Sequence, residues 1–266
     1  MTNVQTTTNV RTAVIPVAGV GSRFAPASFY VPKELLPIYD TPALQYVISE
    51  ALSAGVERII LVSSRNKPAI NVFAELVWCS SQIEIVYQDE PNGLGHAVGC
   101  ARDAVAGEPF VVLLPDEIMG TWEPLQQMCA EYTRTGDSVV MLQRVPRSEV
   151  HRYGIADMHE DSRISRVVEK PAADDAPSDM AIIGRYVLGP EIMDYLLDCP
   201  PGALGEVQLT DALQMAAEAG SLRGYASGGL RWDTGNPMGL FLANYDHVVR
   251  DPALRNHLVN HQTLGR

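Results

Sequence analysis

The stretch "TAVIPVAGVGSRF", residues 12–24, joins an apolar run to a loop with two glycines. The run before the loop is apolar and partly β-branched, which favours a strand buried on both faces of a sheet. Gly19 and Gly21 then allow a tight turn that exposes backbone N–H groups, and such a turn suits phosphate. Arg23 and Lys33 supply cations that can neutralise a polyphosphate. An ordinary strand-to-helix turn with two solvated cations fits the same residues, so the loop alone leaves both interpretations open.

Two common phosphate-binding motifs do not match this loop. The dinucleotide motif G-x-G-x-x-G requires glycine where the chain has Phe24, and the P-loop motif G-x-x-x-x-G-K-[ST] has no match. The loop is therefore of another kind, in which G-V-G-S-R-F is followed by Pro32-Lys33-Glu34.

Short apolar runs alternate with helical patterns through the first half of the chain. The runs predict strands and the patterns between them predict helices. The expected strands are 12–18, 58–63, 83–87 and 110–115, and the expected helices are 41–55, a stretch around 66–78, and 93–105. Thr41 is the predicted N-cap of the first helix, and Pro42 its first residue. This order predicts an α/β fold with a Rossmann-like, doubly wound, mostly parallel sheet.

From residue 137 the pattern changes to strands with little helix between them. The expected strands are 138–145, 153–159, 164–170 and 180–188, and helices follow at 190–198, 207–219 and 237–250. Consecutive strands of this kind predict a mixed or antiparallel extension of the sheet, which forms the other side of a cleft. Because no linker interrupts the chain, residues 1–266 are expected to form a single domain, with halves at 12–136 and 137–250 and a helical tail at 251–266.

The composition disfavours several classes of protein. The net charge of −12 argues against a nucleic-acid-binding surface, although a few fixed cations still allow small anionic ligands. No apolar run reaches the roughly 18 residues of a membrane span, and the polar N-terminus lacks the apolar core of a secretory signal. Cys79, Cys100, Cys129 and Cys199 form no C-x-x-C pair, which favours reduced thiols over a zinc or disulfide framework. We expect a cytoplasmic protein with neither a nucleic-acid nor a membrane partner.

A set of separate motifs runs along nearly the whole chain, from Thr12 to Pro252. It consists of G-x-G-x-R-x-x-P, P-K-E-L-L-P, Gln88 with NGLGHAV (92–98), LLPDE (113–117), YGI (153–155), VVEKP (167–171), IIGRYVL (182–188), GEVQLTDAL (205–213) and WDTGN (232–236). Each motif is weak alone, but the ordered set is specific. It resembles the sugar-nucleotide pyrophosphorylases, and among these the bacterial UTP–glucose-1-phosphate uridylyltransferases.

The resemblance implies the nucleotidyltransferase fold and a reaction between UTP and glucose 1-phosphate. In such a reaction the sugar phosphate attacks the α-phosphorus in line and pyrophosphate leaves, so positioning and charge neutralisation matter most. The resemblance also implies a magnesium ion (Mg²⁺) held by Asp116 and Asp233, with substrate phosphates completing its ligands. A helix N-cap for Asp116 and an Asx-turn for Asp233 are the alternatives. Glu117 would point to the opposite side from Asp116 if the strand continues, and it is therefore not assigned to the metal.

The resemblance also implies roles for four charged side chains that match positions of the family motifs. Arg23 and Lys33 are expected to hold the β- and γ-phosphates of UTP, which makes the first half of the chain the nucleotide-binding half. Lys170 is expected to hold the sugar phosphate and Glu169 to accept hydrogen bonds from sugar hydroxyls, in the sugar-phosphate-binding half. A surface ion pair is the alternative for these two neighbours.

The resemblance also implies contacts to the base and from the backbone. Gln88 presents a donor and an acceptor, as uracil requires. His96 is expected to pack or cap, because the reaction needs no histidine base. The nucleotide pocket would be completed by Ala18, Gly19, Gly21 and Gly93. Gly154 and Gly184 would bring the backbone close to the sugar, with a β-bulge or packing glycine as the alternative, above all for Gly184.

Three departures from the family pattern leave the substrates open. Residues 28–33 lack a family lysine before P-K-E, Asn92 replaces another lysine, and residues 66–88 lack a long insertion. Phe29 and Tyr30 are expected to reshape the pocket, so another sugar 1-phosphate, or dTTP in place of UTP, is an alternative. An inactive regulatory homologue that binds sugar nucleotides is a second alternative. The retained metal-binding carboxylates and phosphate-binding cations argue against it. The resemblance further implies a homo-oligomer, either a dimer or a tetramer.

Overall fold

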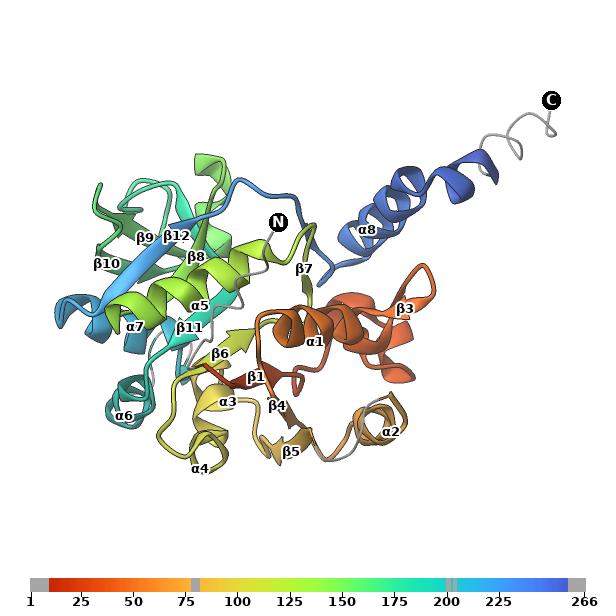
Figure 1. Cartoon of the computed structure of the whole chain (residues 1–266), viewed down its shortest axis with the longest axis horizontal. Coiled ribbons are helices and arrows are strands. Elements are labelled where there is room, and N and C mark those ends of the chain that lie inside the picture. Colours follow the sequence, from red (N-terminus) through yellow and green to blue (C-terminus); the bar gives the residue numbers. More distant parts are fainter. Residues whose placement is uncertain (1–9, 78–81, 200–201, 203–204, 258–266) are drawn as a thin grey trace, which may run out of the picture.

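The computed structural model describes residues 10–77, 82–199, 202 and 205–257. Within these residues, nine strands form one sheet in the order β10-β9-β11-β6-β1-β4-β5, with β8 beside β11 and β12 beside β8 (Figure 1). The strands are β1 (Thr12–Pro16), β4 (Arg58–Ser63), β5 (Ile83–Tyr87), β6 (Phe110–Leu113), β8 (Ser138–Arg144), β9 (Gly154–Met158), β10 (Ile164–Glu169), β11 (Met180–Leu188) and β12 (Leu222–Ala226).

Two short ribbons and a set of helices surround this sheet. The ribbons are β2 (Pro37–Ile38) with β3 (Thr41–Pro42), and β7 (Glu117–Met119) with β13 (Arg231–Asp233). The α-helices are α1 (Ala43–Ser53), α2 (Pro68–Val77), α3 (Leu94–Cys100), α4 (Arg102–Val105), α5 (Glu123–Thr135), α6 (Glu191–Asp198), α7 (Leu209–Glu218) and α8 (Pro237–Arg250). Four short 3-10 helices are also described, at Ser22–Phe24 (η1), Ala27–Phe29 (η2), Lys33–Leu35 (η3) and Arg147–Arg152 (η4).

The direction of the strands changes across the sheet. β1 is parallel to β4 and β6, and β4 is parallel to β5. β11 is antiparallel to β6, β8 and β9, and β10 is antiparallel to β9. The predicted fold class is therefore confirmed: a mostly parallel central sheet carries an antiparallel extension. The parallel pairing of β12 with β8 was not predicted.

Each face of the sheet carries its own hydrophobic core. Side chains alternate between the faces along a strand, so Ala13 and Ile15 pack with α1, α2 and α5, while Val14 packs with α3, α6 and α7. Burying one large aliphatic side chain stabilises the fold by about 1.5–3 kcal/mol. Helices cover both faces, which explains why the central strands read as nearly continuous apolar runs.

Some predicted elements differ from the structure. α5 was not predicted, although Leu125, Met128, Cys129 and Tyr132 point to the core at helical spacing. The predicted helix 93–105 is divided at Ala101 into α3 and α4. The predicted cap of α1 was wrong by one residue, because Thr41 and Pro42 pair with β2 and Pro42 takes the N-cap position.

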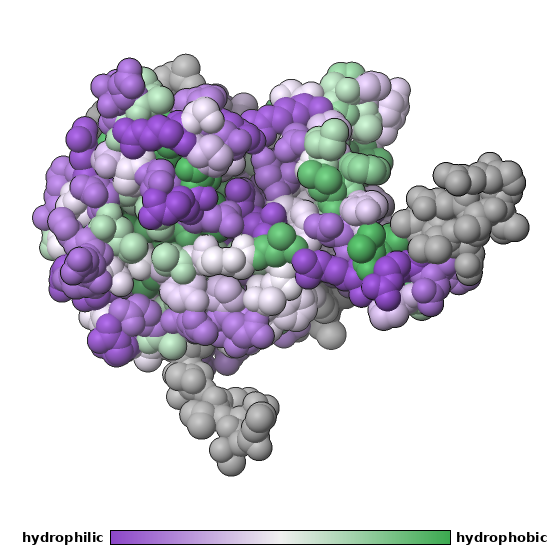
Figure 2. Space-filling view, turned by 90° about the horizontal axis from the view of Figure 1, so that it is seen from above, coloured by the Kyte–Doolittle hydropathy of each residue, from purple (hydrophilic) through white to green (hydrophobic). Residues whose placement is uncertain are grey.

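The helix α8 projects from the body of the molecule (Figure 1). It exposes an apolar row at helical spacing, Met238, Phe241, Leu242 and Tyr245. Figure 2 shows a face on which hydrophilic residues predominate and hydrophobic ones form separate small groups.

No helix among the described residues is long and apolar enough to cross a membrane. The predicted tail at 251–266 lies partly outside the described residues, and Cys79 also lies outside them. Cys100, Cys129 and Cys199 carry free thiols.

Candidate active site

A cleft of about 430 Å³ lies between the two halves of the chain. It brings together seven of the predicted site residues, namely Arg23, Asp116, Gly154, Glu169, Lys170, Gly184 and Asp233. They come from the loop after β1, the turn after β6, β9, the end of β10, β11 and β13. The other six predicted site residues are not among those that line this cleft, namely Ala18, Gly19, Gly21, Lys33, Gln88 and Gly93.

Asp116 and Asp233 lie close together, although they are far apart in the sequence. Asp116 sits in the turn between β6 and β7, three residues past Leu113, where β6 ends earlier than predicted, and Asp233 ends β13. Thr234 ties the two loops, because its N–H and hydroxyl donate to the Asp116 carbonyl oxygen at 2.7 and 3.0 Å. A Cβ added at Gly235 would lie 2.8 Å from Asp116 Oδ2 and 3.0 Å from Asp233 Oδ1. Glycine at this position therefore leaves room between two converging carboxylates.

Each of these carboxylates is paired with a cation. Lys33 Nζ donates to Asp116 Oδ2 at 2.5 Å, and Arg152 Nη2 donates to Asp233 Oδ2 at 3.3 Å. Burial lowers the pKa of Lys33, but the charge and hydrogen bond of Asp116 outweigh it, so the pKa is raised above its ordinary value. Asp233 Oδ1 also accepts from the Gly235 N–H at 3.0 Å, as in the Asx-turn alternative.

The two carboxylates fit a hard divalent cation such as Mg²⁺. Oxygen ligands from one or two carboxylates plus substrate phosphates are its usual protein environment. No cluster of three or more metal-ligating side chains occurs in the part of the chain that the structure describes. A metal ion held by Asp116 and Asp233 would therefore need further ligands from substrate or water, and it would compete with Lys33 and Arg152.

The side expected for Glu117 was wrong, because the strand does not continue and Glu117 lines the same cleft as Asp116. The chain turns at Asp116, so the side-chain alternation of a continuing strand does not apply there. Both oxygens of Glu117 accept from Arg231 Nη1, at 2.8 and 2.7 Å. Burial raises the pKa of Glu117 to about 7 in spite of this ion pair. Because Arg231 occupies both oxygens, Glu117 is not a free third metal ligand.

A fully buried ion pair supports the turn that carries Asp116. Arg185 Nε and Nη2 donate to the two carboxylate oxygens of Glu50 at 2.9 and 2.7 Å, and both side chains are at most 2% exposed. The same guanidinium donates to the carbonyl oxygens of Leu114 and Glu117 at 3.1 and 2.6 Å. Arg185 therefore fixes the backbone on both sides of Asp116.

On the sugar side of the cleft, Glu169 is held in place by its neighbours. Glu169 Oε2 accepts from the Thr210 hydroxyl at 3.0 Å, and Oε1 pairs with Lys170 Nζ at 3.3 Å. Lys170 is half exposed and has a positive φ of 43°, a strained backbone that its N–H stabilises by donating to Tyr153 O. The surface ion pair that was the alternative for Glu169 and Lys170 is thus present, and it lies at the cleft.

The two sugar-side glycines are sites of close packing. A Cβ at Gly154 would lie 2.7 Å from Thr210 Cγ2, and one at Gly184 would lie 2.8 Å from Glu117 Cγ. Gly184 thus fits the packing alternative, because it makes room for the buried Glu117 side chain.

The side chain of Gln88 has less hydrogen-bonding capacity free than the sequence suggested. Its Nε2 donates to Gly93 O at 3.2 Å and lies 2.9 Å from His96 Nδ1. Both amide hydrogens are thus engaged, which leaves the carbonyl oxygen Oε1 for a ligand. Gly93 itself is required by the fold, since φ is 93° and a Cβ would lie 2.5 Å from Val207 O.

The glycine-rich loop has open space beside Gly19. Nothing surrounds a Cβ built at Gly19, and Gly21 has a φ of 71° that favours glycine. Arg23 is exposed and makes no hydrogen bond or ion pair within the described residues. Lys67 Nζ fixes the base of the loop by donating to Val17 O at 2.7 Å and to the buried Glu34 at 2.9 Å.

Sequence reasoning missed several residues of this site. Arg152, Thr210 and Thr234 stand within or beside quoted motifs, which was the signal that could have found them. Lys67 gave no local signal, because its partner Glu34 is far away in the sequence. Phe29 and Tyr30 are exposed and do not line the cleft, contrary to the prediction that they reshape it.

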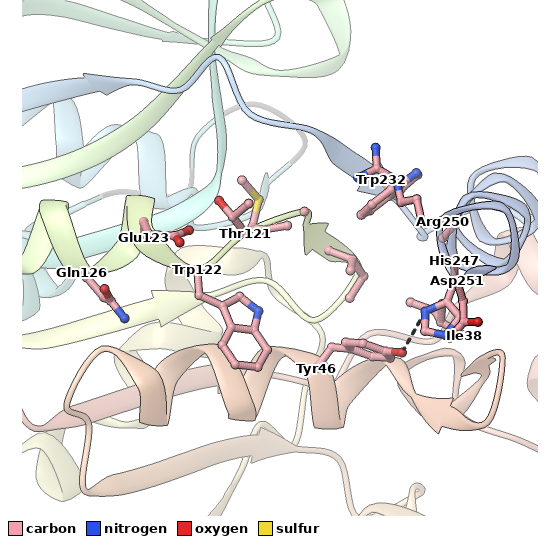
Figure 3. Close-up of a pocket in the computed structure, with 14 residues that line it drawn as sticks. Ile38, Tyr46, Thr121, Trp122, Glu123, Gln126, Trp232, His247, Arg250 and Asp251 are labelled. Carbon is pink, nitrogen blue, oxygen red and sulfur yellow. Dashed lines mark hydrogen bonds between the residues drawn. The ribbon is translucent and has the colours of Figure 1, made fainter. Parts of the chain in front are cut away.

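A second, larger cavity of about 730 Å³ contains none of the predicted site residues. It lies between α1, α8 and the start of α5, and Figure 3 shows Trp122, Trp232 and Tyr46 around it. Tyr46 Oη and His247 Nδ1 are 3.5 Å apart at one end. Its lining is mainly apolar, whereas phosphate chemistry needs charged groups. The smaller, charged cleft is therefore the candidate active site.

Comparisons with known proteins identify the family of the chain. The model of the Nucleotidyl transferase family matches residues 12–248. UTP–glucose-1-phosphate uridylyltransferase of Bacillus subtilis (strain 168) is 42% identical over 94% of this chain and 95% of its own, and that of Staphylococcus haemolyticus (strain JCSC1435) is 38% identical over 94% and 96%. A UDP-glucose pyrophosphorylase from Acinetobacter baumannii superimposes with a TM-score of 0.84 and 32% identity, covering 97% of this chain and all of that one. The chain belongs to the Nucleotidyl transferase family, among the UTP–glucose-1-phosphate uridylyltransferases.

Proposed function

We propose that this chain joins UTP and glucose 1-phosphate to give UDP-glucose and pyrophosphate. The observation that carries the proposal is the pairing of two converging carboxylates, Asp116 and Asp233, with cations from both halves of the cleft. The curated relatives bear the name of this activity, and related structures are described as UTP-bound and as complexed with UDP-glucose. The chain contributes position and charge, which is what in-line phosphoryl chemistry requires.

Mg²⁺ is the proposed cofactor, held by Asp116 and Asp233. When bound, it would act as a Lewis acid that neutralises phosphate charge. Arg23 and Lys33 bind the β- and γ-phosphates and stabilise the leaving pyrophosphate. Lys170 holds the sugar phosphate against the α-phosphorus. These assignments place separate cations at the two ends of an in-line displacement.

The remaining site residues orient the substrates. Glu169, held by Thr210, accepts from sugar hydroxyls, and Gly154 gives the backbone close approach to them. Gln88 Oε1 accepts from the uracil N3–H, because its amide hydrogens are already engaged. The backbone of Ala18, Gly19, Gly21 and Gly93 completes the nucleotide side.

Pyrophosphate release with a panel of nucleoside triphosphates and sugar 1-phosphates tests the proposal. UTP with glucose 1-phosphate should give the highest kcat/KM. A preference for dTTP or for another sugar 1-phosphate would keep the chemistry and correct the substrate. Binding of UDP-glucose without any turnover would support a regulatory homologue instead.

Arg23→Ala should lower the rate while leaving UDP-glucose binding nearly intact, because the product lacks the β- and γ-phosphates of UTP. Arg23→Lys should rescue only partly, since a point charge does not reproduce a planar fork. Steady-state kinetics and calorimetry with UDP-glucose measure the two effects. Arg65→Ala is the control, because Arg65 pairs with Asp89 outside the cleft. If Arg23→Ala lost UDP-glucose affinity as severely as turnover, the loop would hold another part of the substrate.

Lys170→Ala should weaken the use of glucose 1-phosphate much more than the binding of UTP. Loss of a charge-assisted contact costs roughly 1.5–3 kcal/mol, or about 10- to 100-fold in kcat/KM. Titration of each substrate by calorimetry separates the two affinities. Arg166→Ala removes an exposed charge from the same strand, β10, and should change neither. Equal weakening of both substrates would place Lys170 elsewhere.

We also propose that the chain forms one domain and a homo-oligomer. The two halves, 12–136 and 137–250, share one continuous sheet, which supports a single domain. The exposed apolar row on α8 supports self-association, since monomers rarely expose large apolar groups together. Light scattering of the purified chain measures its mass in solution.

A further inference from the structure

Arg152 lies between the sugar half of the cleft and the carboxylate of Asp233. It ends η4, and its two terminal nitrogens pair with Glu149 Oε2 at 3.2 Å and with Asp233 Oδ2 at 3.3 Å. The guanidinium also lies 5.5 Å from the centre of the Tyr153 ring. Lys33 makes the corresponding contact to Asp116. Each proposed metal carboxylate is thus paired with one cation of the chain.

We propose that Arg152 is an exchangeable cation of this site. It pairs with Asp233 until a divalent cation takes that carboxylate, and it then binds the phosphate of the sugar 1-phosphate. The inference rests on the proposed function and adds a substrate-binding residue to it.

The ion pair between Arg152 and Asp233 is suited to exchange. The Arg152 side chain is 44% exposed, and an ion pair at this exposure contributes little to stability. A divalent cation places two charges against the same carboxylate and therefore competes effectively. The buried pair of Arg185 and Glu50 is the opposite case, because both side chains are at most 2% exposed and meet no solvent or substrate.

The position of Arg152 favours the sugar phosphate over the triphosphate. Arg152 is followed by Tyr153 and by Gly154, which lies beside Glu169. The carbonyl oxygen of Tyr153 accepts from the N–H of Lys170 at 3.0 Å. Arg152 and Lys170 are therefore presented by two adjoining backbone segments on the same side of the cleft. Arg23 and Lys33 come from the other half of the chain.

The negative charge of the substrates favours the transfer of Arg152 from Asp233 to the sugar phosphate. A triphosphate and a sugar phosphate must approach each other in a cleft that already carries Asp116, Asp233 and Glu169. An oxygen of the sugar phosphate forms the new bond to the α-phosphorus, and the bond from that phosphorus to the β-phosphate oxygen breaks. Pyrophosphate leaves with the electron pair. A planar guanidinium that binds two oxygens of the attacking phosphate screens this repulsion and orients a third oxygen for attack.

Metal and substrate binding should change in opposite directions in Arg152→Ala. Mn²⁺ binding to the ligand-free chain, followed by electron paramagnetic resonance, should become several-fold tighter because the competing cation is gone. The KM for glucose 1-phosphate should rise roughly tenfold or more, while the KM for UTP changes by less than about twofold. Arg152→Lys should restore part of the loss, because one point charge remains.

Arg147→Ala is the matched control. Arg147 belongs to the same short helix, but it donates to the carbonyl oxygens of Ala176 and Ser178 and does not line the cleft. It should leave both Mn²⁺ binding and the KM for glucose 1-phosphate unchanged.

Three outcomes would overturn the proposal. If Arg152 only fastened η4 to β13, Arg152→Ala would weaken Mn²⁺ and substrate together and lower the melting temperature. An unchanged KM for glucose 1-phosphate would exclude phosphate binding, and a larger effect on UTP would move Arg152 to the other end of the reaction. The Mn²⁺ measurement needs no turnover, and absence of turnover in the wild-type chain would count against the proposed function instead.

Discussion

Asp116→Asn and Asp233→Asn should each lower turnover by roughly 10²–10³-fold or more and leave the fold intact. Each substitution removes one of the two carboxylate charges proposed to hold Mg²⁺, and loss of such charge stabilisation acts on the transition state. The fold should persist because Thr234 donates to the backbone oxygen of Asp116, which an asparagine keeps. Steady-state turnover across a range of Mg²⁺ concentrations measures the effect, and circular dichroism monitors the fold.

The control for these variants is Asp89→Asn, which removes an exposed carboxylate paired with Arg65 outside the cleft. It should behave as the wild-type chain. Wild-type Mg²⁺-dependent turnover in Asp116→Asn or Asp233→Asn would contradict the proposed metal site, with any pair of substrates.

Arg185→Met should destabilise the chain by about 3–5 kcal/mol. The substitution leaves Glu50 as an unpaired charge in the core, and breaking a buried ion pair from one side has this cost. It also removes the donor to Leu114 O and Glu117 O. Denaturant unfolding measures the free energy, and residual turnover at low temperature reports on the position of Asp116.

An exposed pair provides the comparison for Arg185. Arg144→Met breaks the pair of Arg144 with Asp179, in which the arginine side chain is 72% exposed, and should cost at most about 1 kcal/mol. Replacing Glu50 and Arg185 together by apolar residues should recover stability but not turnover, because the carbonyl oxygens beside Asp116 remain without their donor. Equal unfolding free energies for Arg185→Met and Arg144→Met would show that the buried pair is not a support of the site.

Elements with a strong local pattern were predicted from the sequence. The strands at 58–63, 83–87 and 180–188 and the helix at 237–250 agree with the structure residue for residue, because each is a run with a clear period or an apolar continuity. β7 and β13 were missed, because a three-residue strand has no period to detect and is stabilised only by its distant partner. α5 had a pattern that was overlooked.

The site was predictable where motifs carry the ligand-facing residues. Asp116 and Asp233 lie close together as expected, whereas the pairing of these carboxylates with Lys33 and Arg152 is visible only in the folded chain. Glu117 was misplaced, because the alternation rule assumes a straight strand and the chain turns before it. Gln88 lost part of its expected role, because the contact with His96 depends on how α3 packs.

An isotope experiment tests the proposed reaction by following ¹⁸O from substrate to product. Glucose 1-phosphate with ¹⁸O at every phosphate oxygen is incubated with unlabelled UTP, Mg²⁺ and the protein. Mass spectrometry then gives the masses of the products. In-line attack of the sugar phosphate on the α-phosphorus predicts UDP-glucose that carries all of the label and pyrophosphate that carries none. Label in pyrophosphate, or the absence of UDP-glucose, would contradict attack of the sugar phosphate on the α-phosphorus of UTP.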